Sequence, residues 1–177
     1  HDVTVYNRTA AKAQQWAKQY GSKSAATPRD AAKDCDFVMM CVGNDDDVRS
    51  VADGDNGALA GIRKGAVLVD HTTASAIVAR ELHAKCREKG VGFVDAPVSG
   101  GQAGAVNGQL GIMCGGDQGD YDKALPVLNV YAKMCALIGG PGAGQLTKMV
   151  NQIAIVGLLQ GLSEALNFGK KAGLDME

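Results

Sequence analysis

The chain has 177 residues, a formal net charge of −1 and a 46% share of hydrophobic residues, enough for one domain with a substantial core and part of another. It has no block of basic residues and only 5% aromatic residues, so nucleic-acid binding and membrane-surface attachment have no electrostatic or stacking support. The five cysteines lack CxxC spacing and no signal peptide is visible, which predicts reduced thiols in a cytoplasmic protein.

Strand-like apolar runs alternate with helical patterns along the chain. The uninterrupted apolar run at 37–42 is typical of a parallel strand that is covered on both faces. The carboxylates after Asn44 indicate a helix start, with Asn44 or Asp45 as its N-cap. This alternation predicts an α/β fold with an open, doubly wound, Rossmann-like parallel sheet. Strands are expected at 2–6, near 24, and at 37–42, 66–69, 92–94 and 134–138, and helices at 10–20, 28–33, 45–51, 74–89 and about 145–168.

One glycine-rich segment, Gly139–Gly144, suits a domain boundary. We therefore assign residues 1–140 to a dinucleotide-binding domain. Residues 141–177 are assigned to an interdomain helix that begins an all-α C-terminal domain.

The Rossmann-like domain is expected to be incomplete at its N-terminus. Such a domain opens with a strand, a GxGxxG turn and a helix, and these should precede the strand at 2–6. The domain is therefore expected to lack its first strand and its pyrophosphate-binding glycine loop.

Residues 142–151 (GAGQLTKMVN) place a lysine near the start of a helix that carries few other charges. Its neighbours on the helix are apolar: Leu146, Met149, Val150 and Ile153. Burial among them would lower the pKa of Lys148 from its ordinary value of about 10.4, which suits a general acid and base. Asn151 and Gln152 lie on the same helix face and could bind a substrate oxygen. The alternative is a lysine that snorkels to solvent from a buried helix.

A second motif, DAPVSGG at 95–101, directly follows the strand expected at 92–94. Gly100 and Gly101 remove the Cβ barrier to unusual backbone angles, so the chain can turn sharply there. Backbone N–H groups of such a turn, together with the Ser99 hydroxyl, suit a carboxylate or another anion. Taken alone, the segment is also compatible with a simple connecting turn.

Together, DAPVSGG and GxGxxxKxxN resemble the β-hydroxyacid dehydrogenase family, which includes 3-hydroxyisobutyrate dehydrogenase and tartronate semialdehyde reductase. The resemblance implies an oxidoreductase that transfers a hydride between NADP(H) and a small carboxylate-bearing β-hydroxyacid or semialdehyde, with Lys148 as general acid and base. It implies that Ser99, Gly100 and Gly101 bind the substrate carboxylate. Some relatives have an asparagine four residues after the lysine, where this chain has Gln152, so the amide role is left open between Asn151 and Gln152.

The cofactor preference is read at the end of the first strand, where NAD-binding domains place an acidic residue. Here the chain has Asn7, Arg8 and Thr9, and a guanidinium matches a 2′-phosphate, so NADP is favoured over NAD. The alternative is an ordinary helix start with a solvated arginine. The next strand end, at Val42 and Gly43, is expected to approach the adenosine ribose and pyrophosphate of the cofactor. The family resemblance implies that Thr73, after the following strand, lies beside the nicotinamide ribose.

No metal site is expected, because three consecutive aspartates at 45–47 cannot all point at one ion. His71 is interpreted as a structural hydrogen-bond partner. The apolar face of the helix at 145–168, with Gly157 and Gly161 four residues apart, predicts that a second domain or a partner subunit covers it, and a homo-oligomer is expected. The rival hypothesis for the function is a non-catalytic, dehydrogenase-like oligomerisation module or an inactive fragment.

Overall fold

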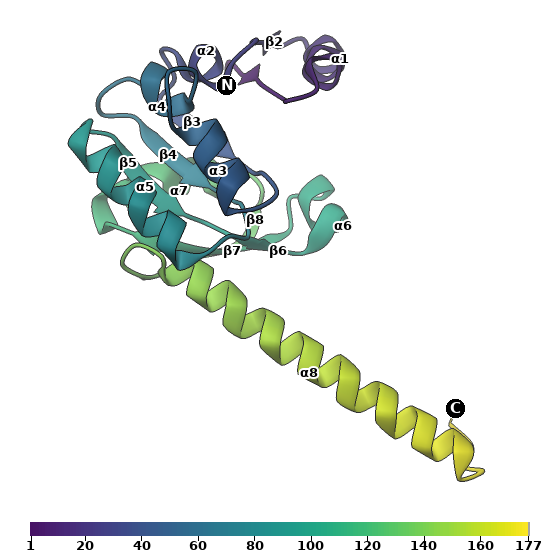
Figure 1. The fold of residues 1–177 in the computed structure, drawn as a ribbon. Helices are drawn as coiled ribbons and strands as arrows, with labels where there is room; N and C mark the ends of the chain where they lie inside the picture. Colours follow the sequence, from purple (N-terminus) through teal and green to yellow (C-terminus); the bar gives the residue numbers. More distant parts are fainter. Residues whose placement is uncertain (177) are drawn as a thin grey trace.

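The structure is a computed structural model that describes residues 1–176. From β1 to β5 every strand is separated from the next by at least one helix, and a single long helix lies nearest the C-terminus (Figure 1). The strands are β1 (Thr4–Val5), β2 (Lys23–Ser24), β3 (Phe37–Met40), β4 (Val67–Asp70), β5 (Gly92–Asp95), β6 (Val98–Ser99), β7 (Leu110–Gly116) and β8 (Ala132–Gly139). The helices are α1 (Ala10–Tyr20), α2 (Pro28–Ala32), α3 (Asp45–Ala52), α4 (Ala58–Gly61), α5 (Ala76–Glu88), α6 (Gly101–Val106), α7 (Gln118–Leu128) and α8 (Ala143–Lys171).

Polar side chains start the helices that follow β3 and β4. Asn44 Oδ1 accepts a hydrogen bond from the Asp47 N–H at 2.9 Å, which confirms Asn44 as the N-cap of α3. Ser75 caps α5, since its Oγ accepts from the Val78 N–H at 3.1 Å. The Ser75 N–H in turn donates to Asp45 Oδ1 at 2.8 Å. The starts of the two helices are therefore tied together.

The α/β, Rossmann-like class is confirmed, with β3, β4 and β5 as parallel neighbours in one sheet. β7 is not among the expected strands; it pairs antiparallel with β5 and β6 and parallel with β8. β1 and β2 form a separate two-stranded parallel sheet. Glycine permits the close approach of β7 to β5, because a Cβ at Gly116 would lie 2.7 Å from the Phe93 carbonyl oxygen.

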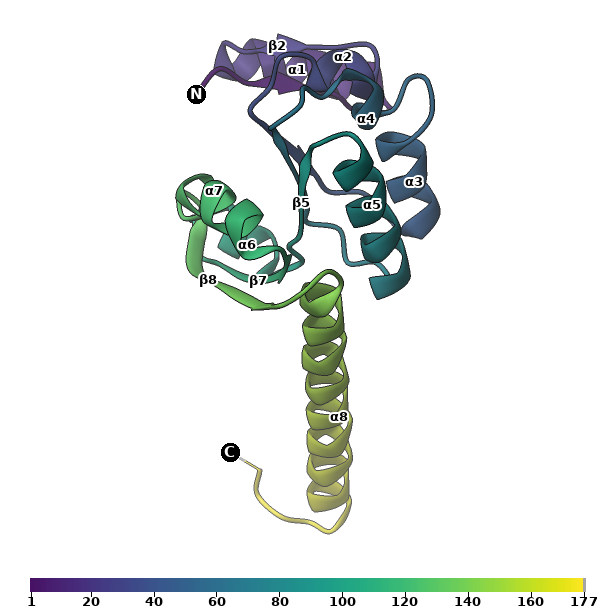
Figure 2. The ribbon, with the colours of Figure 1, turned by 90° about the vertical axis from the view of Figure 1, so that its left-hand side faces the viewer.

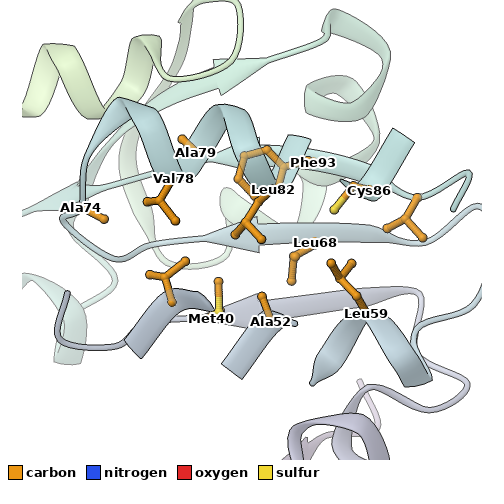
Figure 3. Close-up of a cluster of buried hydrophobic side chains, with 12 residues drawn as sticks. Met40, Ala52, Leu59, Leu68, Ala74, Val78, Ala79, Leu82, Cys86 and Phe93 are labelled. Atoms are coloured by element: carbon orange, nitrogen blue, oxygen red, sulfur yellow. The ribbon is translucent and has the colours of Figure 1, made fainter. Parts of the chain in front are cut away.

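The core has two parts, one on each face of β4 and β5. Figure 2 shows α3 and α5 on one side of β5 and α7 on the other. In the first part, Leu68 of β4 and Phe93 of β5 pack with Val78 and Leu82 of α5 (Figure 3). The second part lies against α7. Because every residue of β4 and β5 is buried, the ends of these strands are held rigidly.

The prediction that the strand at 37–42 is covered on both faces is wrong for the described residues. β3 lies at one end of the six-stranded sheet, and Met39 is 38% exposed. The apolar run matches a central strand of a parallel sheet, and within residues 1–176 no strand pairs with the outer edge of β3.

Helix α8 is 29 residues long and extends away from the rest of the molecule (Figure 1). Among residues 1–176 it is the one helix long and apolar enough to cross a membrane, judged by length and composition alone. The same properties belong to a helix that forms the core of a larger protein. Its exposed large apolar side chains are Leu146, Val150, Ile153, Ile155, Val156, Leu158, Leu159, Leu162, Leu166 and Phe168.

The apolar surrounding predicted for Lys148 is therefore not present within the described residues. Leu146 is 45% exposed, and Ile153 is 74% exposed. Both belong to the uncovered surface of α8 and do not enclose the amine. The prediction assumed that an apolar helix buries its own neighbours, whereas burial requires a second element packed against it.

Candidate active site

The carboxyl ends of three parallel strands meet at one edge of the sheet. In the strand register, Met40 of β3 pairs with Asp70 of β4, and Asp70 pairs with Asp95 of β5. The loops that follow these strands therefore begin side by side. This edge is where open α/β sheets bind ligands.

Buried polar side chains are concentrated at this edge. Among residues 1–176 they are Asp70, Thr72, Asp95 and Gln145. Thr72 Oγ1 accepts a hydrogen bond from the Val42 N–H at 3.0 Å, and the Thr72 carbonyl oxygen accepts one from Gln145 Nε2 at 2.7 Å. The loops after β3 and β4 are thus connected to the first turn of α8.

Asp95 connects β5 to the same turn of α8. Its Oδ1 accepts from the Gly142 N–H at 2.8 Å, and its Oδ2 accepts from the Gln145 N–H at 3.0 Å. Burial raises the pKa of Asp95, and the backbone donors act against this rise because they stabilise the carboxylate. Gly142, the N-cap residue, has no side chain that could cap the helix. The cap of α8 therefore comes from a different element.

Asp70 is the neighbour of Asp95 on β4. Its Oδ1 accepts from the Thr72 N–H at 2.9 Å, whereas its Oδ2 is buried without a hydrogen-bond partner. Burial raises the pKa of Asp70 to about 6, and the nearby Asp95 carboxylate adds to the rise. Asp70 therefore keeps its proton to a higher pH than an aspartate in an unfolded chain does.

Lys148 lies against the DAPVSGG turn. Its Nζ donates a hydrogen bond to the carbonyl oxygen of Val98 at 2.8 Å, directly before Ser99. The backbone then turns through Gly100, with φ of 128°, and Gly101, with φ of 59°. Such positive φ angles favour glycine, which accounts for the pair. The structure thus brings together the amine and the turn that the sequence singles out.

The two candidate amides lie in different surroundings. Asn151 is half-buried, and its Nδ2 is buried without a hydrogen-bond partner, whereas Gln152 is exposed. A buried amide donor without a partner is costly, and a ligand oxygen would satisfy it. This position therefore favours Asn151 over Gln152 for contact with a ligand.

The residues expected to contact the adenosine part of the cofactor lie on the surface. Asn7 accepts a hydrogen bond from the Thr9 N–H at 2.9 Å, which shapes the turn after β1. The Arg8 side chain is 87% exposed and lies 3.5 Å from Asp47 at the start of α3. Because this ion pair is long and exposed, it contributes little energy and leaves the guanidinium accessible.

The remaining cofactor candidates follow β3 and β4. The Val42 N–H donates a hydrogen bond to the Thr72 hydroxyl. Gly43 and Thr73, which follow these two residues in the chain, are exposed. A Cβ at Gly43 would lie 2.6 Å from Asp47 Oδ2, so a side chain there would push the Asp47 carboxylate aside. The exposed residues at these strand ends and the accessible Arg8 guanidinium could contact the adenosine ribose and the nicotinamide ribose of a dinucleotide. No glycine loop for the pyrophosphate is present among the described residues.

His71 has a structural role. Its Nδ1 donates to the Ala96 carbonyl oxygen at 2.7 Å, and its Nε2 accepts from the Tyr131 hydroxyl at 2.8 Å. Burial lowers the pKa of His71, so the neutral ring is favoured. The Nδ1 bond holds the start of the DAPVSGG turn, and the Nε2 bond connects the ring to Tyr131, just before β8.

Comparison of the sequence and the structure with known proteins shows the family of this chain. Over residues 1–140 the sequence matches the family described as the NAD binding domain of 6-phosphogluconate dehydrogenase. The chain belongs to this family. Its relatives place it more narrowly among the 3-hydroxyisobutyrate dehydrogenase-like, β-hydroxyacid dehydrogenases, which confirms the resemblance.

Three relatives illustrate the match. An uncharacterized oxidoreductase of Shewanella frigidimarina is 60% identical over 99% of this chain and 60% of its own length. A probable 3-hydroxyisobutyrate dehydrogenase-like protein of Arabidopsis thaliana, designated mitochondrial, is 40% identical over 99% of this chain and 58% of its own length. The structure of Mycobacterium tuberculosis 3-hydroxyisobutyrate dehydrogenase with L-serine has a TM-score of 0.91 at 30% identity, over 99% of this chain and 59% of that chain. The chain thus spans about 60% of the length of these relatives.

Sequence reasoning missed the residues that connect the parts of the site. Asp95 was noted only as the first letter of a motif, and Gln145 was not singled out. A signal was present, because an acidic residue ends each of the apolar strands β4 and β5. A carboxylate at the end of a fully buried strand needs backbone donors, and the first turn of a helix offers them.

Proposed function

We propose that the complete protein is an NAD(P)-dependent oxidoreductase that interconverts a small β-hydroxyacid and the corresponding semialdehyde. The observation that carries the proposal is the hydrogen bond of 2.8 Å between Lys148 Nζ and the Val98 carbonyl oxygen. It supports the proposal because the Lys148 amine lies beside a glycine turn that is suited to a carboxylate. A substrate that carries both a carboxylate and a nearby carbonyl fits this pair of features.

The proposed mechanism assigns one task to each group. The Ser99 hydroxyl and the turn at Gly100 and Gly101 bind the substrate carboxylate, which orients the reacting carbon. Lys148 holds a proton at Nζ and gives it to the developing alkoxide in reduction, or removes the hydroxyl proton in oxidation. Asn151 donates its unsatisfied N–H to the substrate oxygen or orients the amine. The nicotinamide cofactor, when bound, supplies or accepts the hydride.

We further propose NADP as the preferred cofactor. The support is the exposed Arg8 guanidinium at the end of β1, where NAD-specific domains carry an acidic residue. Asp47 opposes this preference, because its carboxylate lies 3.5 Å from the guanidinium and would repel a phosphate. A phosphate dianion forms stronger, charge-assisted hydrogen bonds with arginine than this exposed carboxylate does.

Other properties remain proposals for the complete protein. They are a division between residues 1–140 and 141–177, a homo-oligomeric state and a cytoplasmic location. A mitochondrial location is the alternative, because the Arabidopsis thaliana relative is designated mitochondrial. A protein partner for α8 is favoured over a membrane, because the Mycobacterium tuberculosis structure aligns with 99% of this chain, α8 included.

The direct test is an assay of the full-length protein. Purified enzyme would be supplied with NADPH or NADH and a panel of small semialdehydes and glyoxylate, and absorbance loss at the nicotinamide band would be followed. We expect turnover of at least one carboxylate-bearing aldehyde and none of the matched aldehydes that lack the carboxylate. If the full-length protein binds NADPH yet reduces none of them, the rival hypothesis of a non-catalytic oligomerisation module is supported.

A further inference from the structure

We propose that Asp95 and Gln145 are positioning residues for Lys148. The inference rests on the acid–base role proposed above for Lys148. Both side chains are completely buried and lie between the sheet edge and the first turn of α8. Lys148 follows in the next turn of the same helix. What fixes the first turn therefore fixes the position of the amine.

Asp95 determines where α8 begins. Its two carboxylate oxygens accept from the N–H groups of Gly142 and Gln145 at 2.8 and 3.0 Å. Since Asp95 is also the first residue of DAPVSGG, one residue anchors both the helix that carries Lys148 and the turn that carries Ser99. A shift of the carboxylate would change the distance between these two groups.

Two glycines allow the helix to approach Asp95 this closely. A Cβ at Gly144 would lie 2.4 Å from the Met113 carbonyl oxygen and 2.9 Å from Asp95 Oδ2. A Cβ at Gly115 would lie 2.6 Å from Asp95 Oδ1 and 2.7 Å from the Gly144 nitrogen. The helix end thus sits directly on the backbone of β5 and β7, and a side chain at either glycine would separate them.

Gln145 sets the rotation of α8 about its own axis. Its Oε1 accepts from the Ala74 N–H at 3.0 Å, and its Nε2 donates to the Thr72 carbonyl oxygen at 2.7 Å. The loop that contains Thr72 and Ala74 also contains Thr73, a cofactor candidate. Gln145 therefore relates the position of the amine to the loop expected beside the nicotinamide ribose.

A double-mutant cycle in the full-length protein tests the proposal. The variants are Asp95→Asn, Lys148→Ala and the combination of both. Asparagine keeps one acceptor for α8 but turns an N–H₂ group toward the second backbone donor. We expect Asp95→Asn alone to lower kcat at least about tenfold while the Kd for NADPH changes less than about threefold. In the Lys148→Ala background the same substitution is expected to lower the remaining kcat less than about twofold.

Asp120→Asn is the matched control. The Asp120 carboxylate accepts from the Phe93 N–H at 3.1 Å, near the opposite end of β5 from Asp95. It therefore makes a similar carboxylate–backbone bond that has no connection to α8. We expect it to lower the melting temperature without lowering kcat. A loss of kcat that tracks melting temperature in both variants would show that Asp95 has only a structural role and would overturn the proposal.

The cycle separates failure of this inference from failure of the proposed function. Equal fold-losses of kcat from Asp95→Asn in both backgrounds, with Lys148→Ala alone strongly reduced but still measurable, would overturn the positioning role alone. Normal turnover of Lys148→Ala would overturn both. If Asp95→Asn does not fold, Gln145→Met takes its place in the same cycle, with the same expected coupling to Lys148 and the same contradicting result.

Discussion

At the scale of single residues, the junction of β4, β5 and α8 is defined by two buried carboxyl groups in opposite situations. Asp95 has two backbone donors from α8, whereas one oxygen of Asp70 has no partner. Hydrogen bonds from α8 satisfy the Asp95 carboxylate. Asp70 instead keeps its proton to higher pH, which avoids a buried charge. The two residues should therefore respond differently to substitution.

We predict that Asp70→Asn changes how stability depends on pH. Burial raises the pKa of Asp70 to about 6, against about 3.9 in an unfolded chain. The folded protein therefore holds a proton that the unfolded chain releases, and the contribution of Asp70 to stability is lost as pH rises through this window. Between about pH 4 and pH 7, the wild type should lose about 2 kcal/mol relative to Asp70→Asn, as measured by urea unfolding.

Asp53→Asn provides the contrast. The Lys85 ammonium beside Asp53 lowers the pKa of that exposed carboxyl, so its contribution is present above the unfolded pKa and is lost as pH falls. The free energy of unfolding of Asp53→Asn should therefore fall furthest below that of the wild type at neutral pH. Equal pH dependence of the wild type and Asp70→Asn would show that Asp70 is not perturbed.

A second prediction concerns Arg8. In the full-length protein, Arg8→Ala should weaken NADPH binding about tenfold or more and NADH binding much less, because only NADPH carries the 2′-phosphate that a guanidinium can bind. Isothermal titration with both cofactors measures the difference. Lys12→Ala, which removes another exposed cation on α1, controls for general charge. Equal losses for both cofactors would show that Arg8 does not bind the 2′-phosphate.

At the scale of elements, local signals predicted some parts well. The helix predicted at 10–20 matches α1, and Asn44 caps α3 as expected. The strong apolar runs of β3, β4 and β5 were placed within two residues of their observed bounds. These elements are determined mainly by their own side chains, so sequence periodicity is sufficient.

Nonlocal contacts explain what the sequence did not predict. The register of β7 depends on antiparallel pairing with β5 and β6, and its glycines give no alternation of apolar and polar residues. Lys148 and the Ser99 turn were found from motifs. The cap from Asp95 to Gly142 was missed because it joins residues 47 positions apart. Such a contact has no local pattern.

The glycines between β7 and α8 give a prediction at this scale. Gly115→Ala should destabilise the protein by about 1–3 kcal/mol, because the added Cβ meets Asp95 Oδ1 and the first turn of α8. Chemical unfolding of the two proteins measures the change. Gly119→Ala in α7 is the control, since nothing lies within 4 Å of its Cβ and alanine favours helix. Equal stability of Gly115→Ala and the control would contradict the close contact.

At the scale of the whole molecule, the uncovered face of α8 is the main feature. Val150 is 68% exposed and Val156 is 66% exposed, and among residues 1–176 nothing covers most of the length of this helix. The relatives are longer than this chain, which spans about 60% of them. We expect that the rest of the complete protein or a partner subunit covers this helix.

The 177-residue chain by itself should therefore self-associate and bind NADPH very weakly. Apolar side chains on α8 would pair between copies, and the glycine loop for the pyrophosphate is not among the described residues. Light scattering and isothermal titration measure the two properties. Replacing Val150 and Val156 with serine should reduce the association without changing the fold. A monodisperse monomer with micromolar affinity for NADPH would contradict both expectations.

The central claim is that Lys148 carries the proton in hydride transfer, and its removal tests the claim most directly. In the full-length protein, Lys148→Ala should lower kcat by at least about two orders of magnitude while the Kd for NADPH stays within about twofold. Lys170→Ala, at the far end of the same helix, should have normal kcat. Near-normal kcat for Lys148→Ala, measured beside that control, would contradict the account.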